Sequence, residues 1–349
     1  MTGWQEHPEA PGRRPIRRTT AGGLALALVA AIVAVSVGGG LAIAAPEASP
    51  QGAGGTASPA TEPPTAAEAR AWEAEFLAED DSSEAAATTA KSGKRAPGGP
   101  LFPSRKVLSL YGAAGGFGII GRKSLNGAAR KLNKQVRPYR KRSNEPVIKA
   151  FDLVAVIATR CSGSDDKCRN RVSKETIQRY LRKIRELNGR LILDIQPGRS
   201  NVLEEIKHLK GFIRKRDVDV ALDAEWNVGP KGEPGEDLGS LRAKRINGAT
   251  KKLLKIIRNR DLPPKLLIVH QFRRDSVRGE KNIRRPGKVD VTLNFDGIGS
   301  RSAKSAGYKD LSFPGLFNGF SLFYELDDGL MTPRQVLKLR PQPDYIMYQ

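Results

Sequence analysis

Apolar and polar residues alternate in eight short segments of residues 101–349, and each alternation predicts a β-strand. The predicted strands cover 106–113, 151–159, 190–196, 217–226, 265–272, 288–297, 320–326 and 344–349. Amphipathic periodicity predicts helices over 173–189, 201–216, 240–260 and 332–341. Strands that alternate with helices favour a parallel sheet covered by helices, and eight such units in about 250 residues predict an α/β fold of the (β/α)8 TIM-barrel type.

A doubly wound open sheet is the competing fold. Gly116, Gly118 and Gly121 form a G-x-G-x-x-G motif after the first predicted strand. A dinucleotide site also needs an acidic residue about 20 residues later, at the end of the second strand. The second strand of this chain ends instead in Ala158-Thr159. We therefore expect a glycine-rich loop at the rim of a barrel, and no cofactor.

The first hundred residues have a different pattern. Residues 1–20 contain a basic cluster and precede an uncharged apolar segment at 21–45. This layout predicts a basic cytoplasmic n-region followed by either an uncleaved signal anchor or a signal peptide, with Ala42-Ile43-Ala44 as a cleavage site. Residues 46–100 are rich in Ala, Pro, Ser and Thr, which predicts a disordered linker. The barrel domain, 101–349, would then lie outside the cell membrane, either anchored or secreted.

Charge narrows the choice of partners. The chain carries a formal charge of +22, and residues 101–349 hold 51 of the 59 Lys and Arg but 26 of the 37 Asp and Glu, a balance of +25. Such a field favours an anionic partner, for example an acidic polysaccharide or an anionic cell-wall polymer. We expect no nucleic-acid partner, because the basic residues are spread over several helices without a recognisable binding module. Nothing in the pattern predicts an oligomeric state.

The two cysteines, Cys161 and Cys168, lie in one polar loop. Export predicts that they form a local disulfide. We expect no metal centre of cysteine and histidine, because the few histidines lie far from this loop in the sequence. A Ca²⁺ or Mg²⁺ ion held by Asp194, Asp223 and Glu225 stays open as an alternative.

Acidic residues recur at the C-terminal ends of the predicted strands, on the face opposite the apolar one. In the segment at 217–226, Val218, Val220 and Leu222 face the helices, so the acids that follow face the barrel axis. The same alternation in three other strands predicts a set of converging carboxylates: Asp194, Asp223, Glu225, Asp296 and Glu325. The C-terminal end is where barrel enzymes place their active sites.

Crowded carboxylates repel one another, so one keeps its proton while its neighbour is ionised. This is the acid and base pair that cleavage of a glycosidic bond requires. Polar and aromatic residues near the strand ends are candidates for substrate binding: Tyr111, Gln196, Trp226, His270, Gln271, Asn294 and Tyr324. Whether His270 or Gln271 faces the axis is left open, because both parities of that strand are apolar. The structural alternative is that the acids pair with Lys and Arg.

This arrangement resembles glycoside hydrolase (β/α)8 barrels. In one large clan of retaining enzymes, the acid/base Glu ends the fourth strand and the nucleophile Glu ends the seventh, the places of Glu225 and Glu325 here. Ala224 stands where that clan has Asn. Asp223-Ala224-Glu225 also resembles the end of the chitinase-like motif D-x-x-D-x-D-x-E. The segments LDIQPGRS, LDAEW, VHQF and LNFDGIG are similar to exported actinobacterial proteins.

The resemblance implies a cell-surface glycoside hydrolase with Glu225 as general acid and Glu325 or Asp296 as nucleophile or base. Asp194 and Asp223 would orient groups or tune pKa values. A non-catalytic barrel that binds an anionic cell-wall polymer through its basic surface is the alternative. Phosphodiester hydrolysis is a third hypothesis, with His270 as the one histidine available to it.

Overall fold

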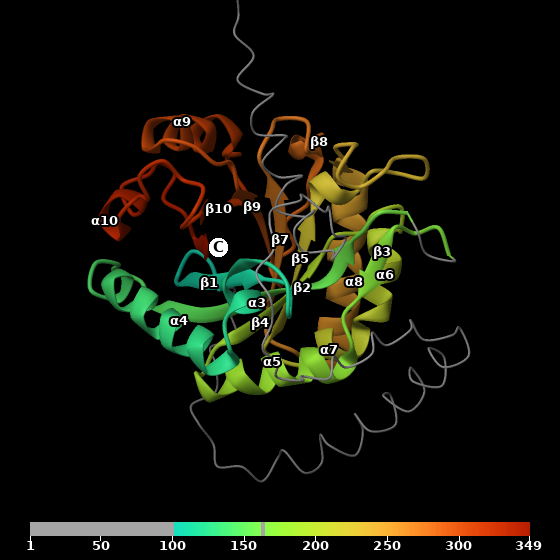
Figure 1. Cartoon of the computed structure of the whole chain (residues 1–349), viewed down its shortest axis with the longest axis horizontal. Coiled ribbons are helices and arrows are strands. Elements are labelled where there is room, and N and C mark those ends of the chain that lie inside the picture. The colour runs from blue at the N-terminus through green and yellow to red at the C-terminus, as the bar shows by residue number, and fades with distance from the viewer. Residues whose placement is uncertain (1–100, 162–164) are drawn as a thin grey trace, which may run out of the picture.

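The computed structural model describes residues 101–161 and 165–349, which form a closed barrel of parallel strands (Figure 1). The eight barrel strands are β1 (Lys106–Gly112), β2 (Val147–Ala158), β4 (Arg190–Ile195), β5 (Val218–Asp223), β7 (Lys265–Gln271), β9 (Val289–Phe295), β10 (Phe317–Leu322) and β11 (Tyr345–Tyr348). The ring closes because β1 pairs with both β11 and β2. The predicted (β/α)8 architecture is confirmed, and the competing open sheet is wrong.

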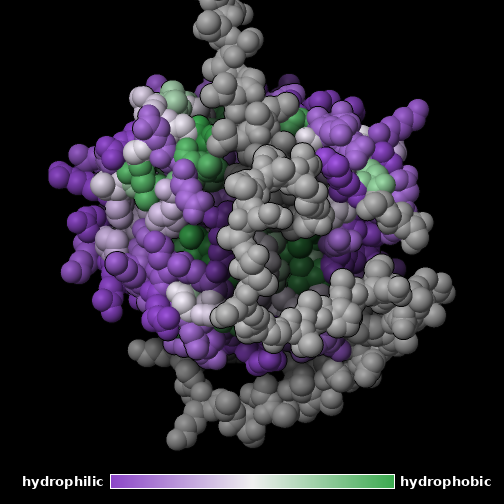
Figure 2. Space-filling model, viewed as in Figure 1, coloured by the Kyte–Doolittle hydropathy of each residue, from purple (hydrophilic) through white to green (hydrophobic). Residues whose placement is uncertain are grey.

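Helices surround the strands. They are α3 (Gly118–Arg122), α4 (Leu125–Arg140), α5 (Lys174–Glu186), α6 (Val202–His208), α7 (Lys210–Ile213), α8 (Ala243–Arg260), α9 (Arg301–Leu311) and α10 (Pro333–Val336). The cap of α5 follows from local sequence, because the Ser173 hydroxyl accepts a hydrogen bond from the Thr176 amide at 3.3 Å. The apolar faces of the helices pack on the outward residues of the strands, and the periphery of the molecule is mostly hydrophilic in Figure 2.

Short elements decorate the barrel. β3 (Arg169–Arg171) pairs antiparallel with β2, and β6 (Leu241–Arg242) pairs with β8 (Val277–Arg278) in a separate two-stranded sheet. Single 3₁₀ turns, η1 (Ala224–Trp226) and η2 (Glu280–Asn282), follow β5 and β8. The predicted disulfide is confirmed: Cys161 and Cys168 are bonded, with their Cα atoms 4.3 Å apart, in the connection from β2 to β3.

The alternation read from the sequence sorts the strand residues into two cores. Val218, Val220 and Leu222 of β5 belong to the large core between strands and helices. Ala221, on the same strand, belongs to a smaller core inside the barrel. Because successive side chains of a strand point to opposite faces, this division places Asp219 and Asp223 inside.

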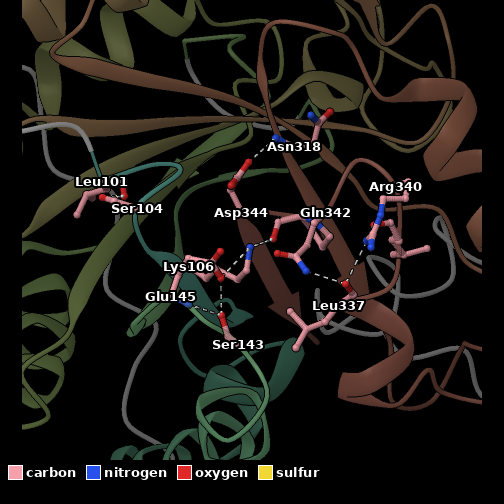
Figure 3. Close-up of polar contacts among 12 residues, drawn as sticks. Leu101, Ser104, Lys106, Ser143, Glu145, Asn318, Leu337, Arg340, Gln342 and Asp344 are labelled. Atoms are coloured by element: carbon pink, nitrogen blue, oxygen red, sulfur yellow. Dashed lines mark hydrogen bonds and ion pairs between the residues drawn. The ribbon is translucent and has the colours of Figure 1, made fainter.

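Residues 101–102 cover the N-terminal end of the barrel, and hydrogen bonds hold them there. The backbone amides of Leu101 and Phe102 donate to Asp290 Oδ2 at 2.7 and 3.1 Å, and the Phe102 ring packs at 5.4 Å from that of Phe317. Beside residues 101–102, Lys106 Nζ donates to the Pro343 carbonyl at 3.1 Å (Figure 3). This network closes one end of the interior with structural contacts, so the candidate site belongs to the opposite end.

Two element boundaries differ from the prediction. β10 spans Phe317–Leu322, whereas the sequence predicted a strand over 320–326. Asn318 and Gly319 disfavour strands locally, but a Cβ at Gly319 would lie 2.5 Å from Asn294 Oδ1, so the glycine is required for pairing with β9. The predicted helix over 201–216 is split at Leu209 into α6 and α7.

The predicted n-region, membrane segment and linker, 1–20, 21–45 and 46–100, lie outside the described residues. Among the helices of residues 101–161 and 165–349, none is both long enough and apolar enough to cross a bilayer.

Candidate active site

The inward-facing residues near the C-terminal ends of the strands form a polar layer. Strands β2, β4, β5, β7, β9 and β10, or the residues that directly follow them, supply it with buried polar side chains on the inner face. Its buried members are Asp152, Asp194, Gln196, Asp223, His270, Asn294 and Ser321. Parallel strands end at the same edge of a barrel, which explains how residues far apart in the sequence converge here.

Glu225 lies in η1, directly after β5. The chain turns there, and the Glu225 carbonyl accepts a hydrogen bond from the Gly239 amide at 2.6 Å. The side-chain oxygen Oε2 is buried and has no hydrogen-bond partner among the described residues. Burial, together with the charges of Asp223 and Asp296, raises the pKa of Glu225 well above its usual range. This shift favours the protonated form of Glu225, the form that can donate a proton.

Asp223, the last residue of β5, accepts a hydrogen bond from the side-chain amide of Gln196. Gln196 Nε2 donates to Asp223 Oδ2 at 3.2 Å and lies 3.3 Å from the Tyr111 hydroxyl. Gln196 Oε1 in turn accepts from the Ala158 amide at 3.2 Å, which fixes the orientation of the Gln196 side chain. Burial and the neighbouring Asp194 raise the pKa of Asp223 well above its usual range.

His270 faces the barrel axis, and its imidazole lies next to Asp296, the residue that directly follows β9. Its Nδ1 lies 3.0 Å from Asn294 Nδ2 and 3.5 Å from Asp296 Oδ2, and Asn294 Nδ2 also donates to Ser321 Oγ at 2.8 Å. Burial opposes a charge on the imidazole, but the contact with Asp296 and the charges of Asp194 and Asp223 raise the pKa of His270 well above its usual range.

The second ring nitrogen of His270, Nε2, takes no part in these contacts. This nitrogen is buried without a hydrogen-bond partner in the part of the chain that the structure describes. The Asp296 side chain is 15% exposed, whereas that of His270 is 2% exposed. The pair therefore combines an inner imidazole with a carboxylate that reaches toward the rim.

Asp194 and Asp152 are further buried acids of this polar layer. Both oxygens of Asp194 lack a hydrogen-bond partner within the described residues, and burial, opposed by His270, raises its pKa to about 7. Asp152 Oδ2 accepts from the Tyr345 hydroxyl at 2.6 Å, and that hydroxyl lies 2.7 Å from Ser109 Oγ. Burial raises the pKa of Asp152 to about 6. Sequence reasoning missed Asp152, whose only signal was one charge within an apolar strand.

Glu325 does not join this layer. β10 ends at Leu322, three residues earlier than the predicted inward position requires. The Glu325 side chain is 72% exposed and accepts two hydrogen bonds from Arg122 Nη1, at 2.8 and 3.0 Å. The expectation that Glu325 lies at an inner strand end is corrected, because the strand pairs over an earlier stretch.

Two further predicted binding residues face away from the axis. Gln271 Nε2 donates to the Leu311 carbonyl at 2.8 Å, toward α9, which settles the open choice in favour of His270. Tyr324 packs on the outer core, and its hydroxyl donates to Gln135 of α4 at 2.6 Å. Trp226 is buried, with 5% of its surface exposed, so its ring is not displayed on an open surface.

The glycine motif has a packing function. Gly118 has a φ of +71°, and a Cβ there would lie 2.5 Å from the Tyr111 carbonyl oxygen. A Cβ at Gly121 would lie 2.1 Å from the Ala113 carbonyl oxygen. These glycines let α3 lie directly against the end of β1, beside Tyr111.

The described residues contain one group of three possible metal ligands within 4.8 Å of one another: Cys161, Asp166 and Cys168. Two of these are joined in the disulfide. Asp194, Asp223 and Glu225 do not form such a group, so the geometry does not favour the alternative of a Ca²⁺ or Mg²⁺ ion at these three carboxylates.

No protein-family model matches the chain, and no curated protein matches it. The structure is similar to that of a proposed alpha-L-fucosidase from Bacteroides thetaiotaomicron. The two are 12% identical, with a TM-score of 0.34, over 74% of this chain and 89% of that chain. At these values the likeness carries no argument about activity.

Proposed function

We propose that the protein is a glycoside hydrolase that cleaves a polysaccharide with Glu225 as proton donor and Asp296 as the opposing carboxylate. The observation that supports this most is the different environment of the two groups. Glu225 Oε2 and Asp296 Oδ1 are both buried without a hydrogen-bond partner among the described residues, but Asp296 Oδ2 also lies 3.5 Å from His270 Nδ1. A glycosidase needs two carboxyl groups in different environments, one to donate a proton and one to act as nucleophile or base.

Glu225 suits the acid role because its neighbours are negative. Asp223 and Asp296 both raise its pKa, so the proton stays on Glu225 at a pH where an exposed Glu is ionised. In the proposed reaction this proton passes to the glycosidic oxygen as the bond to the leaving sugar breaks. Activity should fall as the pH rises through the raised pKa of Glu225, because the donor is then lost.

Asp296 replaces Glu325 as the counterpart carboxylate. Its partial exposure gives it access to a sugar or to water, and its Oδ2 lies 3.5 Å from His270 Nδ1. Asp296 would act on the anomeric carbon directly or through a water molecule. The separation between the two carboxyl groups would decide which outcome applies.

Three other polar groups are suited to holding sugar hydroxyls. The Tyr111 hydroxyl, Gln196 and Asn294 lie in the same layer, and His270 Nε2 is an unpartnered nitrogen among the described residues. Asp223 would tune Glu225 through its proximity and is kept in place by Gln196. Polysaccharide is therefore the proposed substrate class, on the external side of the membrane.

The test compares Glu225→Gln with Glu325→Gln. Both replace a glutamate by its neutral isostere, but only the first removes the proposed proton donor. We expect Glu225→Gln to lower the release of reducing ends from a susceptible polysaccharide by about 10²- to 10⁴-fold. Glu325→Gln should stay within about twofold of the unmodified protein, since that side chain is 72% exposed. Equal activity of the Glu225→Gln variant would sink the assignment.

A non-catalytic barrel that binds an anionic polymer is the second candidate, favoured by the balance of +25 on residues 101–349. It predicts retention on cell walls that weakens with added salt, because salt screens exposed charges. It also predicts that the double variant Glu225→Gln/Glu325→Gln retains this binding. Hydrolysis by the unmodified protein would rule it out.

A further inference from the structure

A basic hollow lies beside the small sheet formed by β6 and β8. It has a volume of about 720 Å³, within the range of ligand sites, and Arg242, Lys244, Arg278 and Arg284 line it. β6 follows β5 and η1 along the chain, and β8 follows β7, so both belong to the connections at the C-terminal ends of the barrel strands. The hollow is therefore on the same end of the barrel as the candidate active site.

We propose that this hollow binds the oxyanion groups, phosphate or carboxylate, of an anionic polysaccharide chain. That the ligand is a polysaccharide rests on the proposed function. That the hollow binds oxyanions rests on the residues of the hollow alone. The proposal deepens that function by naming the chemical class of the substrate and a second place where it is held.

The first support is uncompensated charge. All four cationic side chains are exposed, and none has an ion pair or side-chain hydrogen bond within residues 101–161 and 165–349. No Asp or Glu is among the residues lining the hollow. Arg242 and Arg278 are register partners on neighbouring strands, where like charges destabilise the pair. An oxyanion between them would relieve this repulsion.

The second support is that hydrogen bonds hold the backbone on one side of the hollow in place. Asn247 Nδ2 donates to the Asn282 carbonyl at 2.8 Å, and Asn247 Oδ1 accepts from the Arg284 amide at 2.8 Å. These two hydrogen bonds fasten the segment after β8 to helix α8. The backbone that carries Arg278 and Arg284 is thus held against the helix that carries Lys244 before any ligand arrives, which lowers the ordering cost of binding.

The third support is the chemistry of the cations. Three of the four are arginines, whose planar guanidinium groups bind phosphate and carboxylate through paired hydrogen bonds. Four cations around one hollow of this size fit several anionic groups better than a single ion. A neutral glycan would leave the four charges unpaired. The expected ligand is therefore a chain with repeated negative groups.

The experiment measures binding of the full chain to two labelled oligomers, oligogalacturonate and oligo(glycerol phosphate), by fluorescence anisotropy. The site variant is Arg242→Gln/Arg278→Gln/Arg284→Gln. The matched control is Arg130→Gln/Lys134→Gln/Arg137→Gln on α4, which removes the same charge from another exposed face. Thermal unfolding and circular dichroism establish that both variants fold.

We expect the site variant to bind at least one of the two oligomers about tenfold more weakly, and the control to change by less than about threefold. Which oligomer responds distinguishes carboxylate from phosphate as the recognised group. Equal weakening in both triple variants would show a diffuse basic coat and overturn the proposal, as would no weakening in either. Tighter binding of a neutral dextran oligomer than of both charged oligomers would also overturn it.

A separate measurement keeps this result distinct from the proposed function. Release of reducing ends from a susceptible polysaccharide is followed in the unmodified protein and in the Glu225→Gln variant, alongside oligomer binding by the two triple variants. If the site triple variant loses binding while no polysaccharide is cleaved, the anion site stands and the hydrolase proposal fails. If cleavage depends on Glu225 but both triple variants bind the oligomers equally well, the hydrolase proposal stands and the anion-site proposal fails.

Discussion

Single buried acids give this barrel its chemical character. Asp194 has no hydrogen-bond partner for either oxygen among the described residues, and Asp223 has one amide. In water such groups are ionised at neutral pH, whereas burial here favours their protonated forms. The interior therefore contains buried carboxyl groups with raised pKa values next to His270, a setting typical of acid–base chemistry.

The variant Asp194→Asn tests whether burial raises the pKa of Asp194. The raised pKa of about 7 means that Asp194 contributes stability below its ordinary pKa near 3.8 and that this contribution is lost as the pH rises to about 7. Asn carries no charge, so the variant should become more stable relative to the unmodified protein between pH 4 and pH 8. The gain should reach a few kcal/mol, up to about 4 kcal/mol. Urea unfolding at each pH measures it.

Asp217→Asn is the control with the opposite sign. Although burial opposes its charge, hydrogen bonds from Arg185 at 2.6 and 2.9 Å lower the pKa of Asp217. Its stabilising contribution is present above the ordinary pKa and is lost as the pH falls. The control should therefore be destabilised at pH 7, with the deficit shrinking toward pH 3. The same pH trend in both variants would contradict the interpretation of Asp194.

Individual elements followed the local pattern closely, with exceptions that have nonlocal causes. α8 ends at Arg260, the predicted end of the helix over 240–260, and β4, β5 and β7 lie within one to three residues of their predicted bounds. α9 was not predicted, because its apolar positions are few and only Lys304 and Tyr308 are buried. Lys304 is buried because its Nζ donates to Asp327 and to the Ser321 carbonyl, a tertiary contact without a local signature.

The disulfide between β2 and β3 gives a prediction for one connection. The Cys168 carbonyl accepts from the Thr159 amide at 3.0 Å, so the bond closes a short loop that is already tied to the end of β2. The double variant Cys161→Ser/Cys168→Ser should lower the free energy of unfolding by about 2 kcal/mol, chiefly because the unfolded chain regains the freedom of this short loop.

Urea unfolding with and without reductant measures this effect. The unmodified protein in reductant should match the double variant, and the variant itself should not respond to reductant. A loss of binding or activity in the variant without a loss of stability would instead indicate that the loop has a direct role at the barrel rim.

At the scale of the whole molecule, the barrel depends on the seam where its last strand meets its first. Tyr345 of β11 lies across this seam, with its hydroxyl 2.7 Å from Ser109 Oγ of β1 and 2.6 Å from Asp152 Oδ2 of β2. One hydroxyl thus joins three strands, and the residues that it connects are up to 236 positions apart in the chain. It also supplies a donor to a buried carboxyl group inside the barrel.

Tyr345→Phe should destabilise the protein by about 1–3 kcal/mol, because Asp152 Oδ2 loses its donor. The Tyr345 hydrogen bond lowers the pKa of Asp152, so its removal raises that pKa further above its present value of about 6. Stability lost on raising the pH through this range should therefore be larger in the variant. Thermal unfolding at pH 5 and pH 8 measures the difference.

Tyr348→Phe, on the same strand, is the control for this effect. Its hydroxyl lies 2.7 Å from the Tyr139 hydroxyl, a partner that is neutral at both pH values. The control should lose a similar stability at pH 5 and at pH 8. A pH-independent loss in both variants would show that Asp152 does not titrate between them.

The sequence by itself determined the number and order of barrel strands, the inward face of the strands that carry Asp194 and Asp223, and the cysteine pair. It could do so because strand periodicity, helix amphipathicity and the redox setting act over short distances in the chain. It identified Asp194, Asp223, Glu225 and Asp296 by the same periodicity, since parity within one strand needs no knowledge of its neighbours.

The tertiary structure decided which of these groups meet. Strand pairing ended β10 at Leu322 and left Glu325 on the surface with Arg122, while it brought Asp152 and His270 to the interior. Pairing between β6 and β8 likewise gathered Arg242 and Arg278 around one hollow. These outcomes depend on contacts between segments far apart in the chain, which local patterns do not specify.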